Sequence, residues 1–249
     1  MTTATDDRAL VAGLSQRFVD ELALHAADEA VDSATWPTVG ALAGHVANIY
    51  GWVTEIVRTG EPSPRSDVIL DDADATTTVT AARAHLVAAL DDTDPTSTCW
   101  IIGGGQGSPT FWNRRMVFET MKHLVDLRGA GGSHAPLAPV ELTAELAADG
   151  IDEFFAVFLA RSRSTLPALP GSIAFVATDG SKAWSLTSDW TVGTAADTNP
   201  DADAVVRATA ADLLLLLWER ADALTHVDRF SVDGDRAIVA ALEAAPIHP

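Results

Sequence analysis

The chain has 249 residues, and its 16 lysines and arginines stand against 35 aspartates and glutamates, which gives a formal net charge of −19. A surface this acidic repels polyphosphates and anionic lipids, so nucleic acid and membrane surfaces are excluded as main partners. Hydrophobic residues make up 47% and charged residues 20% of the sequence, a balance typical of a globular protein with one large domain or two small ones.

The N-terminal part of the sequence predicts helices. Over Arg8–Leu24 the apolar residues recur at steps of one, three and four, which indicates one buried helical face. A second helix is expected to follow, with Thr35 as its cap and Pro37 in its first turn. Its apolar stripe continues to Val57, and the segment Gly60–Pro64 is expected to end it.

Two more helices are predicted before residue 130. The third covers about Thr76–Leu90 and ends at Asp91–Pro95. The glycines within Ile101–Pro109 predict a loop, and the fourth helix is expected to cover Thr110–Gly129. Four helices joined by turns predict an up-and-down bundle.

The pattern changes after Gly129–Pro139, a segment rich in Gly, Pro and Ala that resembles a linker. The elements predicted beyond it are a helix at Glu141–Arg161, a hairpin of Ile173–Thr178 and Ala183–Thr187 that turns at Asp179-Gly180, a strand at Ala204–Ala208, a helix at Asp212–Arg220, a strand at Phe230–Val232, a turn at Asp233-Gly234 and a helix at Arg236–Ala244. The expected fold class is therefore α+β, with a helical bundle over residues 1–135 and an α+β domain over residues 141–249.

Cysteine content and hydropathy indicate in which cellular compartment the protein is expected. The one cysteine, Cys99, excludes an internal disulfide framework and a cluster of thiolate metal ligands, and a buried, inert thiol is expected there. The first ten residues are polar and acidic, so we expect no secretory signal. The longest apolar run, Leu213–Trp218, is too short to span a membrane. These features predict a soluble, cytoplasmic protein.

The fourth predicted helix has two contrasting sides. At about 100° per residue, one side collects apolar residues and the other collects residues that carry chemistry. The apolar side holds Val117, Phe118, Met121, Leu124 and Val125, and the other side holds Trp112, Arg115, Glu119, His123 and Asp126. Glu119 and His123 are four residues apart, so both side chains can reach one cation, while Asp126 could orient a ligand. The alternative is a solvated polar face with a Glu–His contact.

The second predicted helix offers a third ligand. His45 lies on the flank of the apolar stripe, on the same side as Asn48 and Trp52. An isolated histidine at such a place is more often a surface or boundary residue. If the two helices face each other, His45 could meet Glu119 and His123, and two histidines with one carboxylate leave an open coordination position. The remaining histidines are expected to be solvated or at helix ends without partners at useful spacing: His25, His85, His134, His226 and His248.

A resemblance to a known family adds to these observations. The segment Thr35-Trp36-Pro37 followed by Leu42 and His45, together with Arg115, Glu119, His123 and Asp126, resembles the mycothiol-dependent maleylpyruvate isomerase family. The resemblance implies a DinB-like N-terminal four-helix domain that holds a divalent metal, usually zinc, through His45, Glu119 and His123. It also implies a small C-terminal domain of the sterol-carrier type, and Ala177–Gly180, Leu213–Trp218 and Val232–Arg236 are similar to that module. The sequence departs from the family pattern at Leu124-Val125, where an Arg-Trp pair is common, and at Lys122, which replaces an apolar residue.

The resemblance also implies a chemistry. A metal-bound thiol forms a thiolate near neutral pH, and the thiol would be mycothiol, a co-substrate. The thiolate would add to an activated double bond, allow rotation and leave again, or it would stay attached as in thiol S-transfer. Arg115 is the candidate for binding a substrate anion.

Three functions therefore compete. The leading hypothesis is a metal-dependent, mycothiol-using isomerase or S-transferase that acts as a monomer or homodimer on a small electrophile. The second is a non-catalytic protein that binds metal or a small apolar ligand through Ile151–Phe158 and Leu213–Trp218, although such stripes are typical of plain core. The third is a DinB-like metal protein with a different thiol or none.

Overall fold

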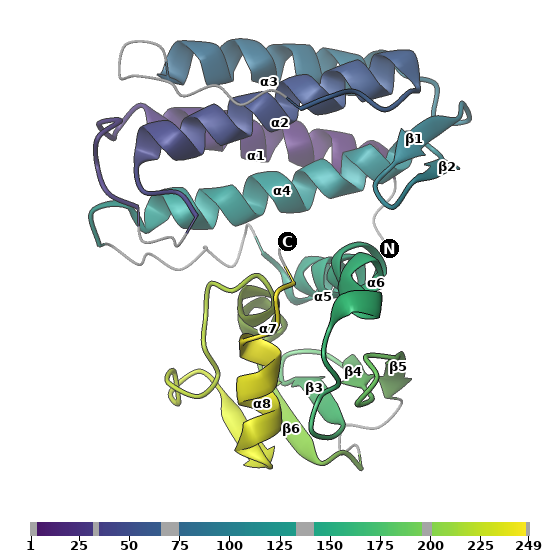
Figure 1. Ribbon diagram of the computed structural model, residues 1–249. Helices are drawn as coiled ribbons and strands as arrows, with labels where there is room; N and C mark the ends of the chain where they lie inside the picture. The colour runs from purple at the N-terminus through teal and green to yellow at the C-terminus, as the bar shows by residue number, and fades with distance from the viewer. Residues whose placement is uncertain (1–3, 32–34, 66–74, 133–141, 196–200, 248–249) are drawn as a thin grey trace. The chain divides into compact units, whose positions relative to one another are not determined.

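The structure, a computed structural model, describes residues 4–31, 35–65, 75–132, 142–195 and 201–247 (Figure 1). The chain divides into two compact units, Met1–Leu137 and Ala138–Pro249. The first unit is built mainly of helices, and the second mixes helices with a sheet. The prediction of an α+β chain that begins with a helical bundle is confirmed. Within the described ranges, every helix is too short or too polar to cross a membrane.

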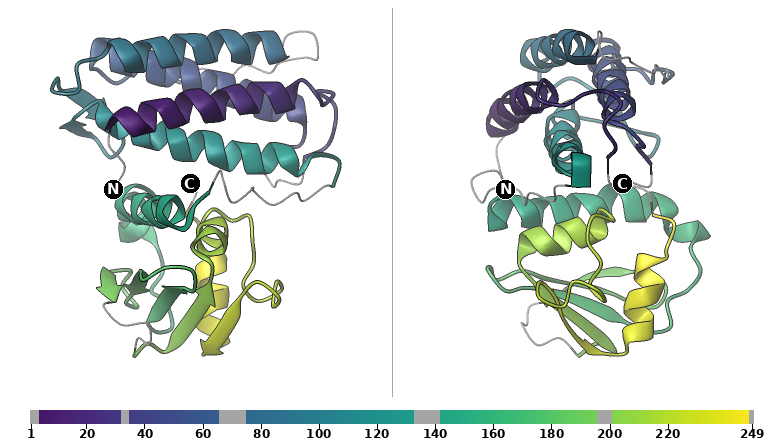
Figure 2. Two further views of the ribbon diagram at one scale, coloured as in Figure 1. Left: turned by 180° about the vertical axis from the view of Figure 1, so that it is seen from behind. Right: turned by 90° about the vertical axis from the view of Figure 1, so that its left-hand side faces the viewer.

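Four long helices make up most of the described part of the N-terminal unit (Figures 1 and 2). They are α1 (Ala4–Leu22), α2 (Val39–Thr59), α3 (Ala75–Asp92) and α4 (Thr110–Arg128). Helix α2 packs against α3 and α4, and α1 packs against α4 and α3. The facing sides carry fully buried apolar residues such as Phe18, Leu42, Leu86 and Phe118, which is the stripe that the periodicity predicted.

The start of α2 differs from the prediction. Thr38, and not Thr35, caps the helix, because the Oγ1 of Thr38 accepts a hydrogen bond from the amide of Ala41 at 3.2 Å. Pro37 lies before the helix, where its carbonyl accepts a hydrogen bond from the Val31 amide at 3.4 Å. This pairing with the preceding segment keeps residues 35–37 out of the helix, and the sequence pattern alone does not reveal it.

The end of α2 agrees with the prediction. Gly60 takes a left-handed conformation with φ of 74°, and its amide donates to the Ile56 carbonyl at 2.8 Å. This is a common way to end a helix, since glycine has no Cβ to strain there.

The segment predicted as a loop before α4 contains a short hairpin. Strand β1 (Cys99–Ile101) pairs antiparallel with β2 (Gly105–Gly107). Gly103 and Gly104 make the reversal, with φ values of 104° and 88° that side chains disfavour. The prediction of a continuous loop was therefore wrong, because the glycines form a tight turn and the strands on either side of it pair.

Cys99 lies in this hairpin and is fully buried, as the prediction of an inert thiol requires. Its Sγ donates to the carbonyl of Ile56 at 3.5 Å, and burial raises the pKa of the thiol.

The C-terminal unit is built around a five-stranded sheet within its described residues, in the order β5-β4-β3-β6-β7. The strands are β3 (Ile173–Ala177), β4 (Ala183–Leu186), β5 (Val192–Ala195), β6 (Ala204–Ala208) and β7 (Ser231–Gly234). The central pair, β3 and β6, is parallel, and the other pairs are antiparallel. Helix α7 (Ala210–Leu217) packs against β3 and β6, and α8 (Arg236–Glu243) packs against β6 (Figure 2).

The single long helix predicted at Glu141–Arg161 forms as a series of consecutive helical segments of different types. Its described part starts with α5 (Ala144–Glu153), which Thr143 caps by accepting from the Leu146 amide at 3.2 Å. A π-helical segment, η2 (Phe154–Leu159), follows, and then α6 (Ala160–Ser162) and η3 (Arg163–Thr165). Residue 141 itself lies outside the described residues.

Two details of the sheet were not predicted. Strand β5 was missed, because it is a short edge strand with little apolar alternation. Asp233-Gly234 was expected to be a turn, but both residues pair with β6. At Gly234 a Cβ atom would meet the Asp203 carbonyl oxygen at 2.2 Å, so glycine serves this close approach of two backbones.

Candidate metal centre

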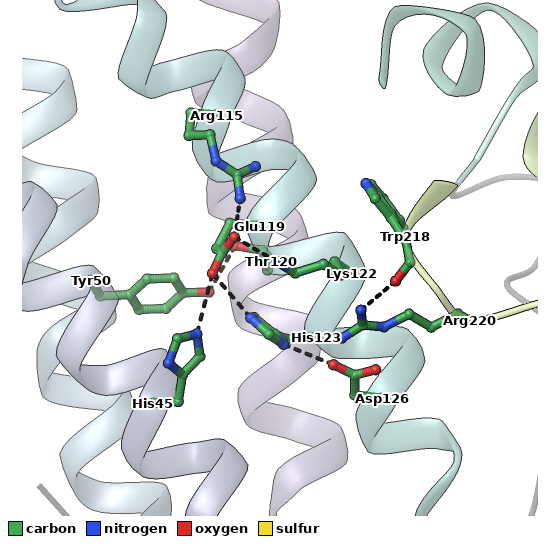
Figure 3. A network of polar contacts seen from close by, with 10 residues as sticks. All are labelled: His45, Tyr50, Arg115, Glu119, Thr120, Lys122, His123, Asp126, Trp218 and Arg220. Atoms are coloured by element: carbon green, nitrogen blue, oxygen red, sulfur yellow. Dashed lines mark hydrogen bonds and ion pairs between the residues drawn. The ribbon is translucent and has the colours of Figure 1, made fainter. Parts of the chain in front are cut away.

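Helices α2 and α4 bring three potential metal ligands together (Figure 3). His45 comes from α2, and Glu119 and His123 come from α4. The Oε1 of Glu119 lies 3.4 Å from Nε2 of His45 and 3.0 Å from Nε2 of His123. One ligand atom from each of the three residues lies within 4.8 Å of the other two. The structure therefore assembles the group of residues that the sequence singled out.

Helix geometry explains this convergence. Glu119 and His123 are one turn apart, so their side chains stand on the same side of α4. Helix α2 runs antiparallel to α4 (Figure 1), and His45 projects from it toward the same point. The imidazole rings of His45 and His123 are 4.8 Å apart between centroids, at 77° to each other.

Trp36 packs against both histidines of the candidate site. Its indole stacks on the His45 ring with centroids 4.1 Å apart and an interplanar angle of 28°. It also meets the His123 ring edge-on at 6.1 Å. No role at this site was predicted for Trp36, although it belongs to the Thr35-Trp36-Pro37 segment that carries the family resemblance. Its contacts restrict both imidazoles to one orientation.

The polar side of α4 is buried. Glu119 is 6% exposed, His123 1% and Asp126 3%. The solvated part of the alternative is therefore wrong, whereas the Glu–His contact that it included is present, with Nε2 of His123 3.0 Å from Oε1 of Glu119.

His123 lies between two carboxylates. Its Nδ1 is 2.9 Å from Oδ2 of Asp126, while its Nε2 faces Glu119. A neutral imidazole has a hydrogen on one nitrogen only, so it can donate to one of these carboxylates and must present a lone pair to the other. With the hydrogen on the side of Asp126, the lone pair of Nε2 points at the three-residue group, as a metal ligand requires.

The second oxygen of Glu119 has cationic partners. The Arg115 guanidinium forms an ion pair with Oε2, and Nζ of Lys122 lies 3.2 Å from the same atom. Burial by itself would raise the pKa of the Glu119 carboxyl, but the charges of Lys122 and Arg115 outweigh it and hold that pKa well below its usual range. Glu119 is therefore ionised, with Oε1 turned to the imidazoles.

The pKa of His45 is also shifted. Burial lowers it, the hydrogen bond to Glu119 opposes this, and the nearby charges of His123 and Lys122 add to the lowering. The neutral imidazole, which is the form that binds metals, is favoured.

The structure gives Arg115 and Lys122 positions that the sequence did not predict. Arg115 was predicted to bind a substrate anion, and it contacts Glu119, so its role toward substrate stays a prediction. Lys122 was noted only as a departure from the family pattern, yet it is 4% exposed and contacts the same carboxylate. Its spacing of three residues from Glu119 was the signal for this pair.

The other histidines follow the predictions in part. His85 is exposed, as expected, but the Nδ1 of His25 lies 2.9 Å from Oε2 of Glu29, one helical turn away in sequence. The prediction that His25 lacks a partner was therefore wrong. His226 is exposed, as expected, and its Nδ1 lies 2.9 Å from the Asp222 carbonyl oxygen. His134 and His248 lie outside the described residues.

Comparisons with known proteins agree with this architecture. Residues 8–128 match the family model of the mycothiol maleylpyruvate isomerase N-terminal domain, and residues 145–241 match that of the MDMPI C-terminal domain. No curated protein sequence matches the chain significantly.

Two solved structures share the fold. A crystal structure of a histidine-to-alanine mutant of the mycothiol-dependent maleylpyruvate isomerase aligns with a TM-score of 0.63 and 16% identity, over 94% of this chain and 96% of that chain. A second crystal structure of the isomerase aligns with a TM-score of 0.62 and 15% identity, over the same shares of both chains. The two domain matches together cover most of the sequence. The chain belongs to the mycothiol-dependent maleylpyruvate isomerase family, a family of isomerase enzymes.

Proposed function

We propose that the chain is a cytoplasmic, mycothiol-dependent isomerase whose catalytic centre is a divalent metal site formed by His45, Glu119 and His123. The observation that carries this proposal is the convergence of their three ligand atoms within 4.8 Å of one another in a buried part of the bundle. Family membership supports both the thiol and the reaction type.

The donor set fits a divalent metal. Two imidazole nitrogens and one carboxylate oxygen are typical of catalytic zinc sites that keep one position open. The contact between His123 and Asp126, at 2.9 Å, orients the ligand nitrogen in the way that metal sites generally use. We propose zinc as the metal, and metal analysis distinguishes it from other divalent ions that accept these ligands.

The chain does not supply the nucleophile itself. Cys99, the one cysteine, is fully buried in the hairpin, and the pKa of its thiol is raised. The nucleophile must therefore come from a co-substrate, for which the family indicates mycothiol. A divalent metal lowers the pKa of a thiol that binds to it, which makes a thiolate available near neutral pH.

The remaining residues prepare the site for this reaction. Asp126 fixes the ring of His123, Trp36 stacks on His45, and Arg115 holds Glu119. For the substrate we propose a cis double bond conjugated to a carbonyl group and bearing a carboxylate, as in maleylpyruvate. The thiolate adds to the double bond, the resulting single bond rotates, and elimination of the thiolate leaves the trans isomer. We propose that the Arg115 guanidinium also attracts the substrate carboxylate, because the protein as a whole is strongly anionic.

The proposal is tested by turnover with and without mycothiol. Wild type should isomerise maleylpyruvate only when mycothiol is present, and His123→Ala should lose this activity while it keeps its fold. His85→Ala, which changes an exposed histidine, is the matched control and should retain full activity. Full turnover by His123→Ala, or turnover without thiol, would contradict the proposal. Mass spectrometry of the product separates isomerisation from S-transfer, since only a transferred thiol adds mass.

A further inference from the structure

Lys122 is the unexplained residue of the metal centre. Its side chain is 5% exposed, and its ammonium lies 3.2 Å from Oε2 of Glu119, the same oxygen that Arg115 contacts. One guanidinium suffices to balance one carboxylate, and burying a second cation beside it is costly. Lys122 thus adds a second positive charge beside a carboxylate that already pairs with Arg115.

Two cations share one proposed ligand. Arg115 and Lys122 both contact Oε2 of Glu119, whereas Asp126 contacts the Nδ1 of His123. The negative charge of Glu119 is therefore shared between two positive charges, and the two imidazoles bind a metal in their neutral form. With an apolar residue at position 122, the surroundings of the metal would be less positive by one charge.

We propose that Lys122 is a positioning residue that keeps Oε2 of Glu119 away from the metal and lets the centre retain excess positive charge, at the expense of metal affinity. This inference rests on the proposed metal site. A carboxylate that shares its charge with two cations is a weaker donor, so the metal is held less tightly. The same excess charge stabilises an anion beside it, which favours the thiolate form of the co-substrate and an anionic substrate.

Three substitutions separate charge from hydrogen bonding. Lys122→Arg keeps the charge, Lys122→Gln keeps a hydrogen-bond donor without charge, and Lys122→Met keeps only the approximate shape. The matched control is Lys182→Met, the other lysine of the sequence, which is half exposed and pairs with Asp152 at 2.7 Å. Circular dichroism and thermal unfolding verify that each variant is folded.

The first readout is zinc affinity, measured by competition with a chromogenic chelator. Lys122→Gln and Lys122→Met should both bind zinc roughly tenfold more tightly than wild type, because a like charge next to the metal has been removed. Lys122→Arg and Lys182→Met should remain close to wild type. The inference would be overturned if Lys122→Gln and Lys122→Met both bound zinc as tightly as wild type or more weakly. It would also be overturned if the zinc affinity changed in Lys122→Met but not in Lys122→Gln.

The second readout is thiol acidity in the cobalt-substituted protein. With 2-mercaptoethanol as the probe, the absorption band of a cobalt-bound thiolate should develop at higher pH in Lys122→Gln than in wild type. An unchanged or lower midpoint would overturn the inference. A wild type that binds neither zinc nor cobalt would instead contradict the proposed function, so the two failures are distinguishable.

Discussion

The Nδ1 of His123 lies 2.9 Å from the Oδ2 of Asp126, and both side chains are almost completely buried. When Nδ1 carries the hydrogen of His123 and donates it to Asp126, the lone pair of Nε2 points at Glu119 and His45. The three proposed metal ligands should therefore depend on a fourth residue that is not itself a proposed ligand.

Replacing Asp126 with Asn tests this dependence. The amide keeps the shape but loses the negative charge that orients and polarises His123, so zinc affinity should fall by about 10- to 100-fold. Chelator competition measures the change. Asp20→Asn, at an exposed position of α1, is the control and should leave affinity unchanged. An Asp126→Asn protein with wild-type affinity would show that the contact has no influence on the site.

Trp36 should matter for the orientation of His45. Trp36→Ala removes an indole that stacks at 4.1 Å, and such aromatic contacts contribute about 0.5–1.5 kcal/mol. Zinc affinity should therefore drop by roughly 2- to 12-fold, and Trp36→Phe should restore part of the loss. Isothermal titration of the metal-free protein with zinc measures both variants. If Trp36→Ala and Trp36→Phe bound zinc with the same affinity as wild type, the indole would have no role in orienting His45.

Tyr50 and Thr120 join α2 to α4 beside the centre. Their hydroxyls are 2.9 Å apart and buried, and burial raises the pKa of the phenol, so Tyr50 stays neutral. Tyr50→Phe should lower the free energy of unfolding by about 1 kcal/mol, because it leaves the Thr120 hydroxyl without this partner. Urea denaturation measures the loss. The double variant Tyr50→Phe/Thr120→Val should lose less free energy of unfolding than the two single variants lose together. Strictly additive losses would contradict an interaction between the two hydroxyls.

The metal-free protein should become less stable in mild acid because of His45. Burial lowers the pKa of His45 in the folded state, so at pH values just below the ordinary imidazole pKa the unfolded chain binds a proton that the folded chain does not. The free energy of unfolding should therefore fall as pH decreases through this window. Denaturant titrations of metal-free wild type and His45→Gln between pH 7 and pH 5 should show a shallower fall in the variant. If the free energy of unfolding changed with pH at the same slope in both proteins, the lowered pKa of His45 would be contradicted.

Much of the bundle could be predicted from local sequence patterns. The periodicity around Leu42 and Val57 and the glycine at position 60 indicated α2 and its end, since both signals act within a few residues. The cap was misplaced, because Thr35 and Thr38 look alike and the pairing of the Pro37 carbonyl with Val31 decides between them.

The candidate site was predictable to a similar extent. The spacing of Glu119 and His123 follows from one helix, whereas the approach of His45 depends on how two helices pack. The sequence offered it only on the condition that the helices face each other, and the family resemblance then supported it. The burial of Lys122 and the stacking of Trp36 come from tertiary packing and had no equivalent signal in the sequence.

The central claim, a metal held by these three residues, is tested most directly by metal content. Plasma mass spectrometry on purified wild type and on His45→Ala, Glu119→Ala and His123→Ala gives the number of metal ions per chain. Wild type should contain about one equivalent of zinc or a similar divalent ion, and all three variants should have lost it. A folded wild type that contains no metal and takes up none when zinc is added would contradict it.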